Sequence, residues 1–496
     1  MISWSASAAL VIRSRSGTPC EAIGIAHSAL IPPLTALNEL GNDLRDAHHS
    51  ITTAIETNTT DQIAEYARGS AVRHYLSVGD SAGAIAFLTK LNSARAADNR
   101  DLWSSWLPSF IDLAGAEHTD TLAARGYLAH WHGESGSIYT AIAEFEQLEA
   151  DLQRVIGADA PLTLSAREQL AHWHGDQGDT ARAISELEQL LTDRGRVLGP
   201  NHSDTLQTAH NLAWWRGEIG DVAGAITDYE RILPARLHTL GPDHPDTLRT
   251  RNNLAHWRGE NGDSNRAILE YEHVLADRQR VLGPDHPDTL QTAHNLANRR
   301  GENGDLITAI AEYQQILVDR ARVLGPDHPN TLRTRSALAQ WLGENGEIDS
   351  AVHGYRDLLA DHQRILGHDH PDTLTTRNNV AYWLGQSGDA RQAVVELERL
   401  VTDHIHALGP DHPLTLITRS NLAHWHGEQG DLRAAATEHE QLLTDRLRVL
   451  GPAHPDTHRT RRNAAFWRSQ ITDRNASSPA DPQHPGRLDV LGSDHP

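Results

Sequence analysis

The sequence contains almost no cysteine, methionine or lysine. Its 496 residues include one cysteine (Cys20), one methionine (Met1) and one lysine (Lys90). A single cysteine excludes a disulfide within the chain and suits a reducing cytoplasm. The three residues before Lys90 read FLT, so the sequence has neither the Gly-Lys-Ser/Thr motif of a phosphate-binding loop nor the lysine motif of a protein kinase.

Long hydrophobic runs are also missing. No apolar run approaches the ~20 residues that a membrane helix needs. Residues 1–12 include a short apolar stretch without a basic segment or a clear cleavage site, so we interpret it as neither a signal peptide nor an anchor. The 66 acidic residues outnumber the 44 basic ones and give a net charge of −22. We therefore do not expect nucleic-acid binding, which relies on a basic surface.

What the chain has instead is a repeat of 42 residues. The threonine of an HPDTL-like turn recurs at this step, without insertion, at Thr121, Thr163, Thr205, Thr247, Thr289, Thr331, Thr373, Thr415 and Thr457. A fixed period of this size indicates a solenoid, because a single small unit cannot bury its own apolar face and must stack on its neighbours.

Each unit predicts two helices, which in the fourth copy are residues 248–261 and 264 to about 281. Pro245 suits a first helical position, and Asp246 suits a cap or an acid in the first turn. Gly262 separates the two helices at a turn that needs positive φ. Glycine recurs at this turn in eight successive units: Gly136, Gly178, Gly220, Gly262, Gly304, Gly346, Gly388 and Gly430.

These motifs resemble the tetratricopeptide repeat. The Asn-Leu-Ala of the first helix, the Gly-Asp turn, and the Ala, Tyr and Leu of the second helix stand at that family's spacing over about residues 112–472. The 42-residue length and the LGPDHPDTL linker resemble its kinesin-light-chain-like variety, which also forms the sensor half of bacterial NB-ARC-type signalling ATPases. One departure is Arg258, which replaces a usual aromatic residue next to Trp257.

The resemblance implies an all-α fold, a right-handed superhelical solenoid of antiparallel helix pairs. It also implies about seven or eight units in one superhelical turn, with the first helices lining an inner groove. We expect residues 1–60 to be a helical cap or remnant and residues 61–116 a degenerate unit. Residues 117–471 would then form eight repeats plus a final helix, and residues 472–496 a disordered tail.

A polar face of the first helix is the candidate binding surface. At 100° per residue, Arg249, Asn253 and His256 share this face with Glu260, opposite the apolar stripe. Its most regular column is asparagine, at Asn211, Asn253, Asn295, Asn379, Asn421 and Asn463. An amide both donates and accepts, so an exposed ladder of them could bind the backbone of an extended peptide. Hydrogen bonding between repeats is the alternative.

The next column of this face varies from unit to unit. It holds His130, His172, Trp214, His256, Asn298, Gln340, Tyr382, His424 and Phe466. A position that varies while the rest of the repeat stays constant suits a surface that recognises the side chains of a partner. Random variation at a surface position without function would give the same pattern. We therefore predict that Arg249, Trp214, His256 and Tyr382 line the peptide site with the asparagines.

A third column is tryptophan, at Trp131, Trp173, Trp215, Trp257, Trp341, Trp383, Trp425 and Trp467. It shares the apolar side of the helix, so we interpret it as a stacked core. Arg299 interrupts the column. We predict a weak joint there, which hydrogen exchange would contradict if residues 295–303 were as protected as their neighbours.

The 32 histidines do not predict a metal site. In His130-Trp131-His132 and similar pairs the two rings point about 200° apart on a helix, so one ion cannot bind both. The linker histidines, such as His244, recur with the period and indicate turn chemistry. We expect no cofactor and no metal. No nucleophile–base set stands out from the repeats, so an enzyme is not expected either.

Charge is uneven within each unit. The first helix carries Arg249, Arg251 and Arg258, whereas the second helix and turns carry most of the acids. A neutral to mildly basic groove would favour an extended or acidic partner. Arg251 and Arg258 could instead pair with acids of the second helix.

The sequence therefore predicts a non-catalytic, cytoplasmic and bacterial scaffold that binds a protein or peptide in its groove. One alternative is a regulatory fragment of an NB-ARC-type signalling ATPase that lacks its nucleotide domain. Another is a self-assembling solenoid whose incomplete ends stack.

Overall fold

The structure is a computed structural model that describes residues 72–77, 79–93, 95–452 and 454–476. All regular secondary structure in these ranges is helical, as the sequence predicted. None of the helices in these ranges has the length and apolar character needed to cross a membrane. The described residues form two compact units, one holding 72–92 and 104–124 and the other holding 93–103 and the residues from 125 onward.

The first unit contains a short helical hairpin. Its helices are α4 (Val72–Ser77), α5 (Ser81–Lys90), the second half of α6 (Ala96–Ala114) and the first residues of α7 (Thr119–Glu134). Gly79 makes the turn between α4 and α5 at φ +78°, and Ala84 and Leu88 of α5 are buried. These residues carried the expected likeness to a repeat, whereas the predicted segment 1–60 lies outside the described residues.

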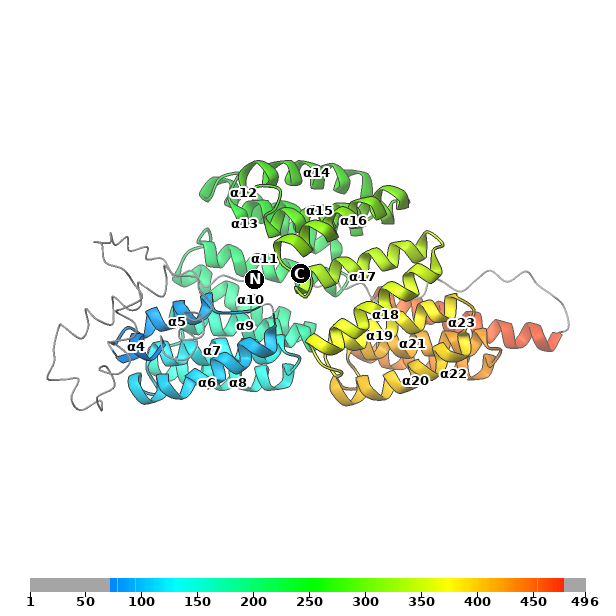
Figure 1. Cartoon of the computed structure of the whole chain (residues 1–496), viewed down its shortest axis with the longest axis horizontal. Coiled ribbons are helices and arrows are strands. Elements are labelled where there is room, and N and C mark those ends of the chain that lie inside the picture. Colours follow the sequence, from blue (N-terminus) through cyan, green and yellow to red (C-terminus); the bar gives the residue numbers. More distant parts are fainter. Residues whose placement is uncertain (1–71, 78, 94, 453, 477–496) are drawn as a thin grey trace, which may run out of the picture. The chain divides into compact units, whose positions relative to one another are not determined.

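In the second unit an A helix and a B helix alternate in chain order (Figure 1). After α7, the A helices are α9 (Pro161–Asp176), α11 (Ser203–Glu218), α13 (Pro245–Glu260), α15 (Pro287–Glu302), α17 (Pro329–Glu344), α19 (Pro371–Gln386) and α21 (Pro413–Glu428). The B helices are α8 (Ile138–Ile156), α10 (Thr180–Val197), α12 (Val222–Thr239), α14 (Ser264–Val281), α16 (Leu306–Val323), α18 (Ile348–Ile365), α20 (Ala390–Ala407) and α22 (Leu432–Val449).

The turn residues of each 42-residue repeat set the ends of its helices. Helix α13 begins at Pro245, which confirms the predicted first helical position, and the linker histidine before it is the N-cap. His244 Nδ1 accepts the N–H of Asp246 at 3.2 Å, so Asp246 is a first-turn acid and not the cap. The predicted turn chemistry of the linker histidines is thereby confirmed. Gly262 has φ +93°, which confirms the predicted positive φ.

Neighbouring repeats are joined by tryptophan packed on glycine. Trp383 is 2% exposed and its ring covers Gly343 in the preceding A helix, where a Cβ would overlap the indole. The same contact joins Gly133 to Trp173, Gly175 to Trp215, Gly217 to Trp257, Gly301 to Trp341, Gly385 to Trp425 and Gly427 to Trp467. The tryptophan column is therefore a packing column, as predicted, and it needs a glycine partner that the sequence analysis did not identify.

A second column of contacts uses buried arginine. Arg236, at the end of α12, is 1% exposed and donates to the carbonyl of Asp246 at 2.8 Å and to Thr250 Oγ1 at 2.7 Å, both in the next A helix. Burial lowers the pKa of Arg236 to about 10, so the guanidinium is still charged at neutral pH. Equivalent bonds are made by Arg194, Arg278, Arg320 and Arg446.

Six repeats complete one turn of the array, so that repeat seven contacts repeat one. The cap of α19, His370, donates from Nε2 to the carbonyl of Glu134 at the end of α7, at 3.2 Å. His412 makes the same bond to Asp176 at 3.2 Å, and His454 bonds the backbone of Glu218. The expectation of seven or eight units per superhelical turn is therefore wrong, because repeat seven already lies on repeat one.

The array ends in a ninth A helix, α23 (Pro455–Ala476). It continues five residues beyond the predicted end at 471, into the segment predicted to be a disordered tail. Trp467 is buried, and its ring covers Gly427 of α21 as in the complete repeats. The rest of the predicted tail, residues 477–496, lies outside the described residues.

The glycine under each tryptophan gives a direct test of the packing. In Gly343→Ala the added methyl group would overlap the Trp383 ring, so we expect the free energy of unfolding in urea to fall by about 1–3 kcal/mol. Gly195→Ala is the matched control, because this helical glycine has no neighbour within 4 Å of an added Cβ. The control should be neutral or stabilise the protein by up to about 1 kcal/mol. Equal effects of the two substitutions would contradict the packing role.

The buried imidazole of His439 in α22 makes stability depend on pH. Burial, together with the charge of Arg446, lowers its pKa to about 4, so the folded state resists protonation that the unfolded chain accepts near its ordinary value. This contribution to stability is present above the unfolded pKa and is lost as the pH falls towards the folded one.

Tyrosine occupies the equivalent position at Tyr229, Tyr271, Tyr313 and Tyr355. We therefore expect His439→Tyr to gain stability relative to the wild type by on the order of 2 kcal/mol between about pH 7.5 and about pH 5. Urea unfolding at the two pH values measures this difference. A stability difference that does not change with pH would refute the role of His439.

Candidate functional site

The candidate surface is the polar side of the A helices, which we call the helix-A face. In α13 it consists of Arg249, Asn253, His256 and Glu260, and in the other A helices of the residues at equivalent positions. In α13 the first three of these residues are half-buried and Glu260 is exposed. Contacts four residues apart, such as Asn298 Nδ2 to Glu302 Oε1 at 2.9 Å, confirm that these columns share one side of the helix.

The asparagine column does not form an open ladder. Asn379, Asn421 and Asn463 are buried, whereas Asn211, Asn253 and Asn295 are half-buried. The predicted exposure is therefore wrong for the first three. The physical reason is that this column faces the preceding A helix.

The hydrogen bonds of the column run between repeats. Asn211 Nδ2 donates to Glu168 Oε1 at 2.9 Å, and Asn421 Nδ2 donates to Asn378 Oδ1 at 3.2 Å. Asn253 Nδ2 lies 3.1 Å from His210 Nε2, again in the preceding repeat. The alternative given by the sequence, hydrogen bonding between repeats, describes these amides.

The variable column lies at the rim of the tryptophan packing. Trp214 and His256 are half-buried and stack with ring centroids 5.4 Å apart and an interplanar angle of 20°. The ring at this position also meets the tryptophan of the next repeat, as in Trp214 with Trp257 at 5.1 Å. Tyr382 is only 6% exposed, so its predicted place on an open surface is wrong. The column thus presents fixed, partly exposed rings in the first repeats.

One of these rings is held neutral. Burial and the neighbouring His172 lower the pKa of His130 to about 4, so its imidazole can donate and accept at neutral pH. His130 Nε2 lies 3.9 Å from Glu134 Oε1 on the same side of α7. A neutral ring and a carboxyl group are therefore held side by side.

The last residue of most A helices is acidic. This column holds Glu134, Asp176, Glu218, Glu260, Glu302, Glu344 and Glu428. An acid at a helix C-terminus is opposed by the helix dipole, which favours cations there. Local helix stability therefore does not explain the column, and residues that break a local rule point to function.

The arginines expected to make this face basic are paired elsewhere. Arg251 Nη1 bonds Asp277 Oδ2 of α14 at 2.7 Å. Arg258 bonds Glu270, also in α14, and it bonds Glu230 of α12 at 2.7 Å. The prediction of a mildly basic surface from Arg251 and Arg258 is therefore wrong, because B-helix acids neutralise them. Arg249 stays on the helix-A face, where it pairs with Asp246 at 2.7 Å.

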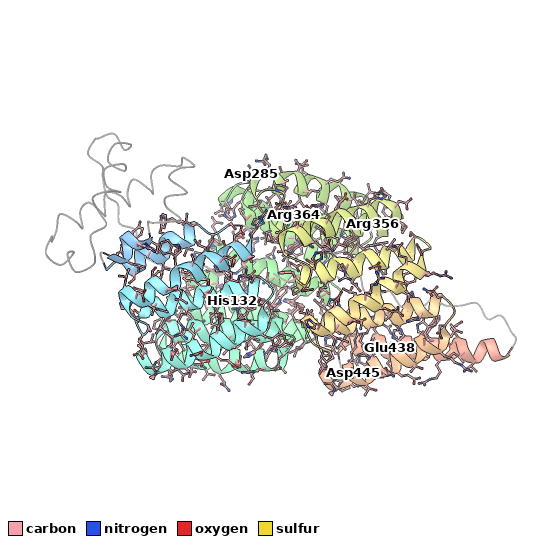
Figure 2. The ribbon with its side chains drawn as sticks, turned by 60° about the horizontal axis from the view of Figure 1, so that its bottom comes forward. His132, Asp285, Arg356, Arg364, Glu438 and Asp445 are labelled. Atoms are coloured by element: carbon pink, nitrogen blue, oxygen red, sulfur yellow. The ribbon has the colours of Figure 1, made fainter. Side chains whose placement is uncertain are left out.

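Charged side chains of the B helices and the linkers, among them Asp285 and Arg364 (labelled in Figure 2), also form ion pairs. Arg364 bonds Asp327 in the preceding linker at 2.7 Å and Asp361 in its own helix at 2.7 Å. Asp285 occupies the equivalent position in the linker one repeat earlier, and it pairs with Arg322 of α16. Much of the acidity away from the A helices is thus balanced locally.

Comparison with known families now places the chain. Two models described as tetratricopeptide repeat match it, one at residues 218–279 and 301–360 and the other at 163–204, 373–414 and 415–456. The chain is a tetratricopeptide repeat protein. A comparison with curated proteins found no significant match.

Several solved structures are similar to parts of this tetratricopeptide protein. A kinesin-light-chain-type protein of P. anserina with nearly identical repeats is 27% identical, with a TM-score of 0.36 over 41% of this chain and 97% of its own. BtubC of P. vanneervenii is 20% identical, with a TM-score of 0.38 over 46% and 91%. A signal transduction ATPase with a tetratricopeptide sensor from Pyrococcus horikoshii is 11% identical, with a TM-score of 0.42 over 83% and 54%.

The paired histidines of this tetratricopeptide protein have separate partners. His130 faces Glu134, whereas His132 Nδ1 lies 2.6 Å from Glu144 Oε2 of the following B helix (Figure 2). Within the described ranges, no cluster of three or more histidine, cysteine or acidic side chains is arranged to hold a metal ion.

Arg299 replaces one tryptophan of the column without leaving a hole. Its side chain is buried over Gly259 and bonds Glu260 at 2.7 Å and Glu302 at 2.6 Å. Both acids belong to the acidic column of the helix-A face. The substitution therefore exchanges apolar packing for two ion pairs that are partly withdrawn from water.

The predicted weak joint at Arg299 can be measured by hydrogen exchange. We expect amides of residues 295–303 to exchange faster than those of 253–261 in the preceding A helix. The reason is that a desolvated ion pair usually stabilises a core less than apolar packing does. Arg299→Trp should restore the protection of 295–303. Equal protection of the two segments in the wild type would disprove a weak joint.

Proposed function

We propose that this chain is a non-catalytic scaffold that holds an extended protein segment along the helix-A face. The observation that carries the proposal is the acidic column, because seven carboxylates at helix C-termini are kept at one periodic position against the helix dipole. The partly exposed rings of His130, His172, Trp214 and His256 lie one turn before it and would contact side chains of the segment.

The charge of this face favours a basic or donor-rich partner over an acidic one. Arg251 and Arg258 are neutralised by B-helix acids, which removes the basis for an acidic ligand. Arg249 and the half-buried amides of Asn211, Asn253 and Asn295 would contribute donors beside the carboxylates. Opposite charges across an interface mainly speed association and select partners, so binding should weaken as salt rises.

An array of immobilised peptides of basic, neutral and acidic composition tests the proposal. We expect the wild type to bind basic peptides in a salt-dependent manner. The combined variant Glu344→Gln and Glu428→Gln removes two acids of the helix-A face, at helix C-termini other than those bonded by His370, His412 and His454. It should lose at least about threefold in affinity, as expected for two charges of modest individual effect.

The matched control removes two exposed acids from the B helices, in Asp357→Asn and Glu398→Gln. It changes the net charge by the same amount, so it should keep wild-type binding if the helix-A face is the site. Equal losses in the two variants, or a preference of the wild type for acidic peptides, would refute the proposal.

A further inference from the structure

The array contains an interface that it uses three times within itself. The first surface, which we call the turn edge, consists of the end of an A helix and the glycine turn after it. The second, which we call the linker edge, consists of the histidine cap and the proline that begin an A helix. The turn edge of repeat one meets the linker edge of repeat seven, and the next two repeats follow at the same step.

The fit of these two edges is close. An added Cβ at Gly136 would lie 3.2 Å from His370 and 3.4 Å from Pro371, and at Gly178 it would lie 2.7 Å from Pro413. Tyr139, just after the first turn, donates its hydroxyl to the carbonyl of Leu408 at 2.9 Å. The glycine turns therefore admit a linker that a larger residue would exclude.

In each contact a neutral histidine accepts a hydrogen bond at one ring nitrogen and donates one from the other. In the linker edge, Nδ1 accepts the N–H two residues later, as His370 does from Asp372 at 3.1 Å. The proton is then on Nε2, which donates to a carbonyl at the end of the other A helix. Each contact thus satisfies one carbonyl that the end of an α-helix leaves without an intrahelical partner.

Most of both edges is not covered by the residues that the structure describes. Turn-edge glycines Gly262, Gly304, Gly346 and Gly388 have no described atom within 4 Å of an added Cβ. On the linker edge, the side chains of His244 and His286 are 38% and 39% exposed, against 10% for His370 and 14% for His454, which lie in the internal interface. The uncovered residues repeat the motifs of the covered ones.

We infer that a second copy of this chain covers these edges, with the linker edge of one copy seated on the turn edge of the next. We infer a second copy because the open edges continue the internal interface. They carry the same capping histidines and glycine turns as the edges that already contact each other within the chain. The two edges are different surfaces, so the contact is heterologous and leaves a free edge of each kind on the outermost copies. This self-association goes beyond peptide binding and does not depend on it.

Sedimentation velocity and light scattering over a range of concentrations test the inference. We expect the average mass of the wild type to rise continuously with concentration beyond that of a dimer. The combined variant His244→Asn and His286→Asn should remain a monomer. Asparagine keeps the N-cap but does not carry the outward Nε2–H.

The matched control is His370→Asn with His412→Asn, which changes the same group within the internal interface. This variant should still associate, because its open edges are unaltered. Three results would overturn the inference: a wild type that stays monomeric at all concentrations, a mass that stops at two copies, or a variant with both His244→Asn and His286→Asn that associates like the wild type. Circular dichroism of each variant establishes that it is folded.

Discussion

The contact between a tryptophan and the glycine of the preceding A helix sets the geometry on which the rest of this structure depends. It brings adjacent A helices close at one point in every repeat, as at Gly343 and Trp383, and so fixes their register. The column beside it, at His256, is thereby held at the rim of the packing. The column one turn later, at Glu260, is placed at the end of the helix, where its side chain is exposed.

Polar groups then specify how the repeats follow one another. Arg236 bonds the backbone and a threonine of the next A helix, and His244 caps that helix through its own side chain. Such buried bonds are costly to break, because each would leave a desolvated donor or acceptor without a partner. Identical bonds in successive repeats give nearly identical steps. A constant step is what allows repeat seven to meet repeat one.

Much of the fold could be predicted from the sequence. The period gave the solenoid, and Gly262, Pro245 and Trp257 gave the turn, the first helical residue and the packing column. The buried arginines and the glycines under the tryptophans also recur with the period. Their roles were missed because a single unit does not show which neighbour each residue meets. The number of repeats per turn could not be predicted, since it depends on a small rotation accumulated over six units.

The candidate site was harder to predict for the same reason. A helical projection places Asn253 on a polar face but does not reveal that His210 of the preceding repeat lies against it. It equally cannot show that Arg258 reaches acids on two B helices. The acidic column was visible as one glutamate per unit, and its significance comes from its position at the end of the helix.

A double-mutant cycle between Gly343 and Trp383 tests the central contact most directly. If the indole and the missing Cβ determine the register, Trp383→Leu should relieve the cost of Gly343→Ala. The measured coupling free energy should then be roughly 1 kcal/mol or more, as for residues in direct contact. Additive effects, within about 0.5 kcal/mol, would show that the two positions are independent and would contradict the account.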